Sequence, residues 1–275
     1  MSNLSQTQGG TSRLEATLAH LKAQHKKALV AYVMAGDPTP AFTEQLVPLL
    51  AQAGADIIEL GFPFSDPMAD GPVIQAASQR ALRQFAHLDD FFALVKRIRQ
   101  QTAVPLVLMT YYNLVLHYGH PRFFAAALAA GLDGAIIPDL ALEEAQEWRS
   151  QAQTAGFATI FLEAPNTTPA NAKAIADASR GFIYMISLKG VTGSDKGMGE
   201  KLQDRVARLR ALTTTPLLVG FGISTAEHAR LYGPMSDGII VGSALISCME
   251  QAQGDAARLA AAQNLIRQLR QGLDA

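Results

Sequence analysis

A glutamate interrupts an apolar stretch of this sequence, and its type and place are suited to proton transfer. Glu59 lies in Ala55-Asp-Ile-Ile-Glu-Leu-Gly61, which is typical of a strand buried on both faces. Glutamate is rarely buried without a partner, and burial raises its pKa. A carboxyl group poised near neutrality can act as a general acid or base. The alternative is a structural glutamate bonded to the backbone or to a neighbouring strand.

Two aspartates follow Glu59 in a long connection, residues 61–72. Asp66 and Asp70 each adjoin a proline or a glycine, so both could serve only as turn residues. A loop that returns over the end of the strand would instead bring one of them back towards Glu59. Two carboxyl groups in one cleft can divide roles, one protonated and one charged, when their environments differ.

Two glycine-containing turns suggest a phosphate site. Gly220-Phe-Gly-Ile-Ser224 follows one apolar run, and Gly242-Ser243 follows the next and opens a helical pattern. Glycine lets backbone N–H groups approach an anion closely, and a helix N-terminus adds the positive end of its dipole. Gly193, in a second long loop over residues 188–199, could add another donor. The alternative is that these turns need glycine for geometry alone.

The remaining reactive side chains give no comparable signal. The histidines are scattered without metal-ligand spacing, and the single cysteine, Cys248, excludes an internal disulfide and a Cys-rich zinc site. Lys189 lies in a Gly-rich loop, a poor place for a Schiff-base lysine that needs a desolvated pocket. Trp148 sits in a helical pattern and is expected to pack. A formal net charge of −1 argues against a partner that is nucleic acid or an anionic membrane.

The elements that must position these residues alternate along the chain. Short apolar runs predict eight buried parallel strands, at Leu29–Met34, Asp56–Leu60, Pro105–Met109, Gly134–Ile137, Ala158–Leu162, Phe182–Ile186, Pro216–Val219 and Gly238–Val241. Helical patterns lie between them, at Thr43–Gln52, Asp89–Gln101, Arg122–Ala130, Glu143–Ala155, Ala170–Ala178, Lys201–Ala211 and Ala226–Tyr232. Gly54, Gly131 and Gly156 stand where helices end before a strand.

Eight strand–helix units predict a single (β/α)₈ TIM barrel, with an extra N-terminal helix near Leu14–Gln24 that covers its lower mouth. A doubly wound open sheet uses the same units and is the alternative. No linker or shift in composition marks a second domain. We therefore expect a flexible N-terminal arm over residues 1–12 and a barrel over 13–275. The polar start and the short apolar runs predict neither a signal peptide nor a membrane span, which suits a cytoplasmic protein.

The longest of these motifs resembles a known family. Glu59-Leu-Gly-Phe-Pro-Phe-Ser-Asp-Pro-Met-Ala-Asp-Gly-Pro72 is similar to the signature E-L-G-x-P-F-S-D-P-x-A-D-G-P of the tryptophan synthase α subunit. Gly36-Asp-Pro38, Tyr111-Tyr-Asn113, Gly190-Val-Thr-Gly193 and the two glycine turns fit its other motifs in order. The resemblance covers nearly the whole chain from about Leu14 onward.

The resemblance implies a lyase that cleaves indole-3-glycerol phosphate to indole and glyceraldehyde 3-phosphate without a metal or organic cofactor. Glu59 matches the acid/base, and Asp70 matches the carboxylate that binds the indole N–H. Tyr184 and Thr192 match a tyrosine lining the site and a threonine of its lid. Phosphate would be bound by four matching residues, Gly193, Gly222, Gly242 and Ser243, while Met109 and Phe221 would wall the indole.

The family also implies a partner. Its α subunit docks on a pyridoxal-phosphate β subunit in an αββα assembly, and Pro63 and Asp66 fall in the docking loop. Met34, Ala141 and Lys189 depart from common family residues, without removing a proposed catalytic or phosphate residue. Three alternatives remain open. They are another phosphate-handling barrel enzyme such as an isomerase or a Schiff-base aldolase, a catalytically weak subunit that activates its β partner, and a self-sufficient lyase that releases indole.

Overall fold

The computed structural model describes residues 12–187, 195–220 and 222–275, and its centre is a sheet of parallel strands. The order of the strands in the sheet is β5-β4-β3-β2-β1-β9-β8-β7-β6. Their bounds are β1 Ala28–Met34, β2 Ile57–Gly61, β3 Leu106–Met109, β4 Gly134–Ile136, β5 Ala158–Ile160, β6 Leu162–Glu163, β7 Ile183–Ile186, β8 Leu217–Gly220 and β9 Gly238–Val241.

The two ends of this sheet belong to one segment of the chain. Only Phe161 separates β5 from β6, and β5 pairs with β4 while β6 pairs with β7. The segment 158–163 therefore supplies one strand position that joins both edges and closes the barrel. The predicted barrel of eight strand positions is confirmed, and each predicted apolar run contains a strand.

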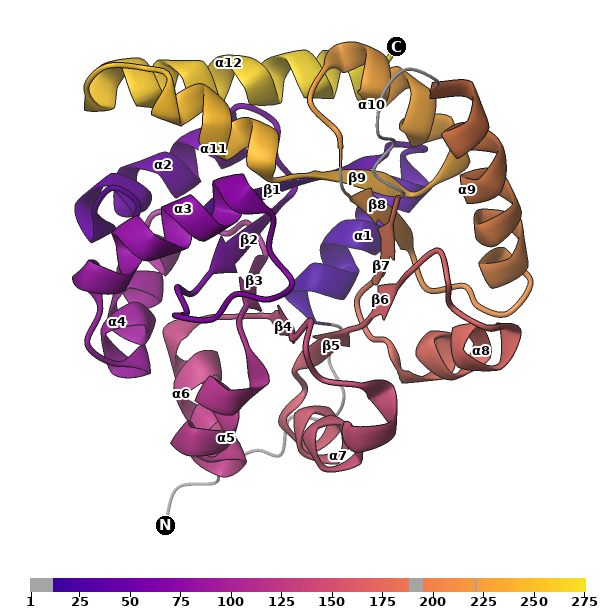
Figure 1. Cartoon of the computed structure of the whole chain (residues 1–275), viewed down its shortest axis with the longest axis horizontal. Coiled ribbons are helices and arrows are strands. Elements are labelled where there is room, and N and C mark those ends of the chain that lie inside the picture. Colours follow the sequence, from indigo (N-terminus) through magenta and orange to yellow (C-terminus); the bar gives the residue numbers. More distant parts are fainter. Residues whose placement is uncertain (1–11, 188–194, 221) are drawn as a thin grey trace.

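Helices surround the barrel in a ring (Figure 1). Their bounds are α1 Arg13–Ala23, α2 Pro40–Gln52, α3 Pro72–Ala81, α4 Leu88–Arg99, α5 Tyr112–Tyr118, α6 His120–Ala130, α7 Gln146–Ala155, α8 Pro169–Ala178, α9 Asp195–Arg210, α10 Ala226–Tyr232, α11 Ser243–Glu250 and α12 Asp255–Leu273. Short 3₁₀ turns lie at Leu82–Gln84, Leu142–Glu144 and Gly233–Met235. All seven predicted inter-strand helices are present, whereas α3, α5 and the long C-terminal α12 were not among the predicted helices.

Local sequence explains where these helices begin and end. Ser12 starts α1 with a capping box, in which its hydroxyl accepts from the Glu15 amide and the Glu15 carboxylate accepts from the Ser12 amide. Gly131 and Gly156 end α6 and α7 in the left-handed conformation, at φ +97° and +70°. The glycine stops before β4 and β5 are therefore confirmed. Residues 1–11 of the expected N-terminal arm lie outside the described residues.

The side chains of the strands alternate between two cores. Outward residues pack under the surrounding helices, while inward residues fill the barrel together with Leu14, Leu18 and Leu21 of α1. Helix α1 thus closes the amino-terminal end of the barrel, as expected, and Figure 1 shows it inside the ring of helices. Near the carboxyl end, the inward positions of β1, β2 and β7 are Tyr32, Glu59 and Tyr184.

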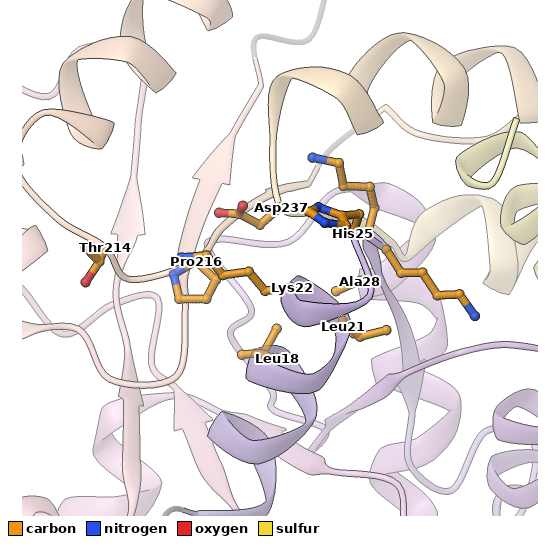
Figure 2. A pocket seen from close by; sticks show the side chains of 10 residues that line it. Leu18, Leu21, Lys22, His25, Ala28, Thr214, Pro216 and Asp237 are labelled. Atoms are coloured by element: carbon orange, nitrogen blue, oxygen red, sulfur yellow. The ribbon is translucent and has the colours of Figure 1, made fainter.

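A cavity of about 360 Å³ opens beside α1 at the amino-terminal end (Figure 2). Its apolar part is formed by Leu18, Leu21, Ala28 and Pro216, and lysines from the turn after α1 stand at its rim. Asp237 also lines it. No helix in the described part of the chain has the length and apolar character needed to cross a membrane.

Candidate active site

Glu59 points into the barrel from the middle of β2, opposite Tyr32 of β1 in the strand register. It is 4% exposed, and its Oε2 atom has no hydrogen-bond partner among the described residues. Burial, and then the negative charge of Asp70, raise the pKa of Glu59 to about 8. Glu59 is therefore protonated at neutral pH, yet close enough to its pKa to release the proton.

The loop after β2 returns over the end of the barrel, as one sequence interpretation required. The Phe62 amide donates to the Met109 carbonyl at 2.9 Å, which extends the pairing of β2 with β3. Ser78 of α3 fixes the next turn, since its hydroxyl accepts from the Phe64 amide and donates to the Phe64 carbonyl, both at 3.0 Å. The Phe64 ring stacks on Tyr111, with centroids 5.0 Å apart.

Tyr111 connects this loop to Asp70. Its hydroxyl accepts from the Ala69 amide at 3.2 Å and donates to Asp70 Oδ2 at 3.0 Å. Burial raises the pKa of Asp70 to about 6, and the hydrogen bond from Tyr111 opposes that rise. At neutral pH Asp70 is therefore mostly ionised while Glu59 is protonated. The two carboxyl groups therefore differ in protonation, which is the condition that a division of roles requires.

Tyr32 and Tyr184 complete the buried part of the site, and each ring leans over a glycine of the following strand. A Cβ atom at Gly61 would lie 2.3 Å from the Tyr32 hydroxyl, and one at Gly220 would lie 2.4 Å from the Tyr184 hydroxyl. A side chain at either strand end would force the tyrosine ring beside it to move. Burial and the charges of Glu59 and Asp70 raise the pKa of Tyr184, so this ring faces both carboxyl groups.

The expected phosphate residues lie at the ends of two neighbouring strands, β8 and β9. Gly222 is exposed at φ +78°, with open space where a Cβ would stand. Gly242 immediately precedes α11, and its carbonyl accepts from the amides of Leu245 and Ile246. The amides of the first helical residues, beginning with the exposed Ser243, point out of the helix end. This edge presents backbone donors and a helix dipole to an anion.

The structure leaves four predicted residues undescribed and places one away from Glu59. Thr192 and Gly193, with Lys189 and Phe221, are outside the described residues. Asp66 is exposed and accepts from the Ser65 hydroxyl at 2.6 Å, so it does not return to Glu59.

Other predicted residues have a place in the site or close to it. Pro63 is buried at the base of the same loop as Asp66, and Met109 lies on the inner face of β3.

Trp148 packs among aromatic rings, as expected, and no three His, Cys, Asp or Glu side chains in the described residues form a metal-binding group.

Sequence reasoning missed two of the tyrosines. Tyr111 was noted only as part of a motif, and its bond to Asp70 depends on how the loop returns, which local sequence does not reveal. Tyr32 lies in a strand whose apolar neighbours gave no reason to separate it from core residues. A signal was present, since tyrosine at an inward strand position must hide or satisfy a hydroxyl.

Known proteins of one family resemble this chain over almost its whole length. A family model described as "Tryptophan synthase alpha chain" matches residues 18–274. The chain is 46% identical over 240 residues to a protein of that name from Geobacter sulfurreducens, covering 87% of this chain and 91% of the relative. It is 43% identical to one from Cupriavidus taiwanensis, covering 96% and 100%.

Solved structures give the same result. The crystal structure of tryptophan synthase subunit alpha from Legionella pneumophila superposes with a TM-score of 0.88 at 38% identity, covering 96% of this chain and 99% of that one. A chain from the crystal structure of tryptophan synthase from M. tuberculosis, in an open form with BRD0059 bound, superposes with a TM-score of 0.86 at 33% identity, covering 97% and 100%.

Proposed function

This chain belongs to the tryptophan synthase alpha chain family and is therefore a lyase of tryptophan biosynthesis, and we propose that Glu59 and Asp70 carry its reaction. That reaction is the cleavage of indole-3-glycerol phosphate to indole and glyceraldehyde 3-phosphate. The observation that carries the assignment is the pair of pKa values, about 8 for Glu59 and about 6 for Asp70, in one buried site.

Breaking the bond between the indole ring and its side chain requires a proton on the ring carbon that bears that chain. Protonated Glu59 donates this proton, which converts the ring to an indolenine. The Glu59 carboxylate then accepts the proton of the adjacent side-chain hydroxyl. The O–H electrons form the aldehyde C=O, the carbon–carbon bond breaks, and its electrons restore the aromatic ring. Glu59 ends the cycle protonated, so atoms and charge balance.

Asp70 stabilises the positive charge that develops on the ring nitrogen after protonation. Its carboxylate accepts a hydrogen bond from the indole N–H, a role that requires the ionised form. Tyr111 holds that carboxylate in place and favours its charge. Because Glu59 is buried and Asp70 is half-buried, the attraction between Asp70 and the developing cation is stronger than it would be in water.

The remaining predicted residues bind the substrate. Gly222, Gly242 and Ser243 contribute donors to the phosphate, together with Gly193, and Tyr184 lines the site beside the carboxyl pair. Thr192 closes next to Asp70 when substrate is bound and so excludes water. The chain needs no cofactor for this reaction.

The partner is a tryptophan synthase β subunit carrying pyridoxal phosphate, in an αββα tetramer in the cytoplasm. The loop with Asp66 supports this proposal, because Asp66 is exposed and Met68 two residues later is 86% exposed, a large apolar side chain left to solvent. Buried Pro63 sets the base of that loop rather than its contact surface. We propose neither a metal site nor a nucleic-acid partner for this chain.

The test measures indole release from indole-3-glycerol phosphate by the purified chain, with and without a β subunit from a relative, between pH 5 and 9. We expect slow release alone, a large increase with the β subunit, and a bell-shaped profile with its maximum between the two pKa values of about 6 and about 8. Fast release without a partner would favour a self-sufficient lyase. Absence of release under both conditions would contradict the catalytic proposal.

A further inference from the structure

Tyr32 lies in the site, but neither the proposed reaction at Glu59 and Asp70 nor the binding of phosphate gives it a role. Its strand, β1, lies between β2, which carries Glu59, and β9, which leads into Gly242. A Cβ atom at Gly242 would lie 3.5 Å from Tyr32 Cβ and Cδ1, and one at Gly61 would lie 2.3 Å from the hydroxyl. The ring therefore spans from the phosphate edge to the strand end just beyond Glu59.

The hydroxyl of this ring has no hydrogen-bond partner in the part of the chain that the structure describes. Tyr32 is 4% exposed, and its Oη atom makes no hydrogen bond with any of the described residues. Oε2 of Glu59, on the neighbouring strand, is unpartnered in the same way. A buried polar atom without a partner lowers the stability of a fold. Two such atoms on adjacent inward positions indicate that a ligand satisfies them.

We infer that the Tyr32 hydroxyl donates a hydrogen bond to a hydroxyl group on the three-carbon chain of the substrate, an inference that rests on the proposed function. The phosphate binds beyond β8 and β9, and the ring lies by Glu59 and Asp70. The chain that joins them must pass over β1, which stands between. Tyr32 is the inward side chain of β1 that ends beside both Gly242 and Gly61.

The surroundings of the Tyr32 hydroxyl keep it protonated, as a hydrogen-bond donor must be. Burial, and then the charges of Asp70 and Glu59, raise the pKa of Tyr32 well above its ordinary value, so the phenol stays protonated at every working pH. A neutral phenol suits an alcohol better than a phosphate, which charged groups or backbone amides bind more strongly. Tyr32 thus recognises the hydroxylated chain and adds nothing to the recognition of ring or phosphate.

The experiment compares two ligands on the full chain with its β subunit. One is indole-3-glycerol phosphate, and the other is an indolylpropyl phosphate that keeps the ring and the phosphate but lacks both hydroxyls. We expect Tyr32→Phe to lower kcat/KM for the first by about tenfold. The Kd of the second should change less than twofold. The variant keeps the ring that packs on Gly242 and Gly61 and loses an unpaired buried hydroxyl, so its Tm should be equal to or above that of the wild type.

Tyr112→Phe is the matched control, because it removes the same atom from α5, where the hydroxyl meets His120 Nε2 at 3.2 Å. It should leave both ligands unaffected. An unchanged kcat/KM in Tyr32→Phe, or an equal loss for both ligands, would overturn the inference. So would a shifted alkaline limb of the pH profile, which would mean that the hydroxyl acts on Glu59. Failure of the proposed function is separate, since the wild type would then release no indole.

Discussion

The two ends of the barrel differ in whether their carboxyl groups are paired with a cation. At the carboxyl-terminal end, neither Glu59 nor Asp70 forms an ion pair with any described residue, and the Asp70 carboxylate accepts a hydrogen bond from Tyr111. At the amino-terminal end, Asp56, Asp133 and Asp237 each stand just before a strand and each contact an arginine. One residue class thus has two opposite environments within one fold.

The amino-terminal aspartates share a single geometry. Each accepts a hydrogen bond at 2.8 Å from a backbone amide at or beside the start of the adjacent strand, and these amides belong to Leu29, Leu106 and Leu217. Asp133 is the most enclosed, with Arg13 at 3.1 Å and Arg99 at 3.2 Å. Such pairs tie neighbouring strands together. The cavity beside α1 is bounded by one of them, because Asp237 on its wall is bonded to Arg210 and to the Leu217 amide (Figure 2).

Whether a carboxyl group is paired with a cation, more than where it lies in the barrel, separates a structural role from a catalytic one. Glu163 ends β6 at the catalytic end of the barrel and is completely buried, so position alone would favour a catalytic role. Arg205, 7% exposed, donates to its carboxylate and also to the carbonyls of Glu163 and Ile186. Glu163 therefore fastens α9 to the barrel. A buried carboxyl group is free for proton transfer only where no cation fixes its charge.

The largest expected effect is on turnover. Glu59→Gln removes the proton that the ring carbon receives and keeps the size of the side chain, so we expect kcat to fall by about 10³-fold or more. Binding of the hydroxyl-free indolylpropyl phosphate should stay within about twofold of the wild type. Indole release in the presence of the β subunit measures the first quantity, and calorimetry the second. Retention of more than a tenth of the wild-type kcat would remove Glu59 from the reaction.

The corresponding carboxyl-to-amide change at the amino-terminal end of the barrel should lower the stability of the fold. Asp133→Asn leaves Arg99 and Arg13 facing an uncharged amide, and breaking a buried pair costs about 3 kcal/mol. We expect that loss in the free energy of unfolding at pH 7, measured by denaturant titration, with kcat unchanged within about twofold. A variant as stable as the wild type would show that the amino-terminal pairs are incidental.

Much of this arrangement was accessible from the sequence, and the limits have physical reasons. Apolar runs and glycine stops located every strand, because burial on both faces leaves a continuous pattern. Glu59 stood out because a charge in such a run needs an explanation. The choice of Asp70 over Asp66 could not be made locally, since both adjoin turn residues and only the path of the loop separates them.

The arginine partners were equally hidden from local sequence. Arg270 meets Asp56 at 2.9 Å across 214 residues, and Arg205 reaches Glu163 across 42. Neither spacing has a periodicity that a sequence pattern could reveal. The distinction between a paired and an unpaired carboxyl group is therefore a property of the closed barrel, and the sequence alone singled out Glu59 without revealing the buried Glu163 or its arginine partner.

A smaller effect tests whether the unpaired site lowers the stability of the fold. The pKa of Glu59 is raised from its ordinary value to about 8, so the folded chain holds this proton more tightly than the unfolded chain. The contribution of this tightly held proton to the free energy of unfolding is thus complete below about pH 4.5 and is lost as pH rises through about 8. Glutamine stays neutral throughout. We expect Glu59→Gln to be more stable than the wild type at pH 8.5, a gain that shrinks as the pH falls from about 8 to about 4.5 and disappears at pH 4.

Thermal unfolding at several pH values measures this difference, and Glu163→Gln provides the contrast. Glu163 is paired with Arg205, so its replacement should destabilise the chain at pH 8.5, where the replacement of Glu59 stabilises it. If both variants lost stability alike, pairing would not distinguish the two carboxyl groups.

The smallest expected effect concerns the hydrogen bond that substitutes for a cation at Asp70. Tyr111→Phe keeps the ring stacked on Phe64 and removes the donor to Asp70 Oδ2, so the pKa of Asp70 should rise further above its ordinary value. A larger share of Asp70 is then protonated near pH 6, and the acid limb of the kcat/KM profile moves to higher pH. We expect a loss of about fivefold at pH 6 that shrinks towards pH 8, where Asp70 is ionised in both proteins. An equal loss at both pH values would mean that Tyr111 only holds the loop in place, whereas a loss confined to low pH shows that a neutral hydroxyl keeps the charge of Asp70 available to the substrate cation.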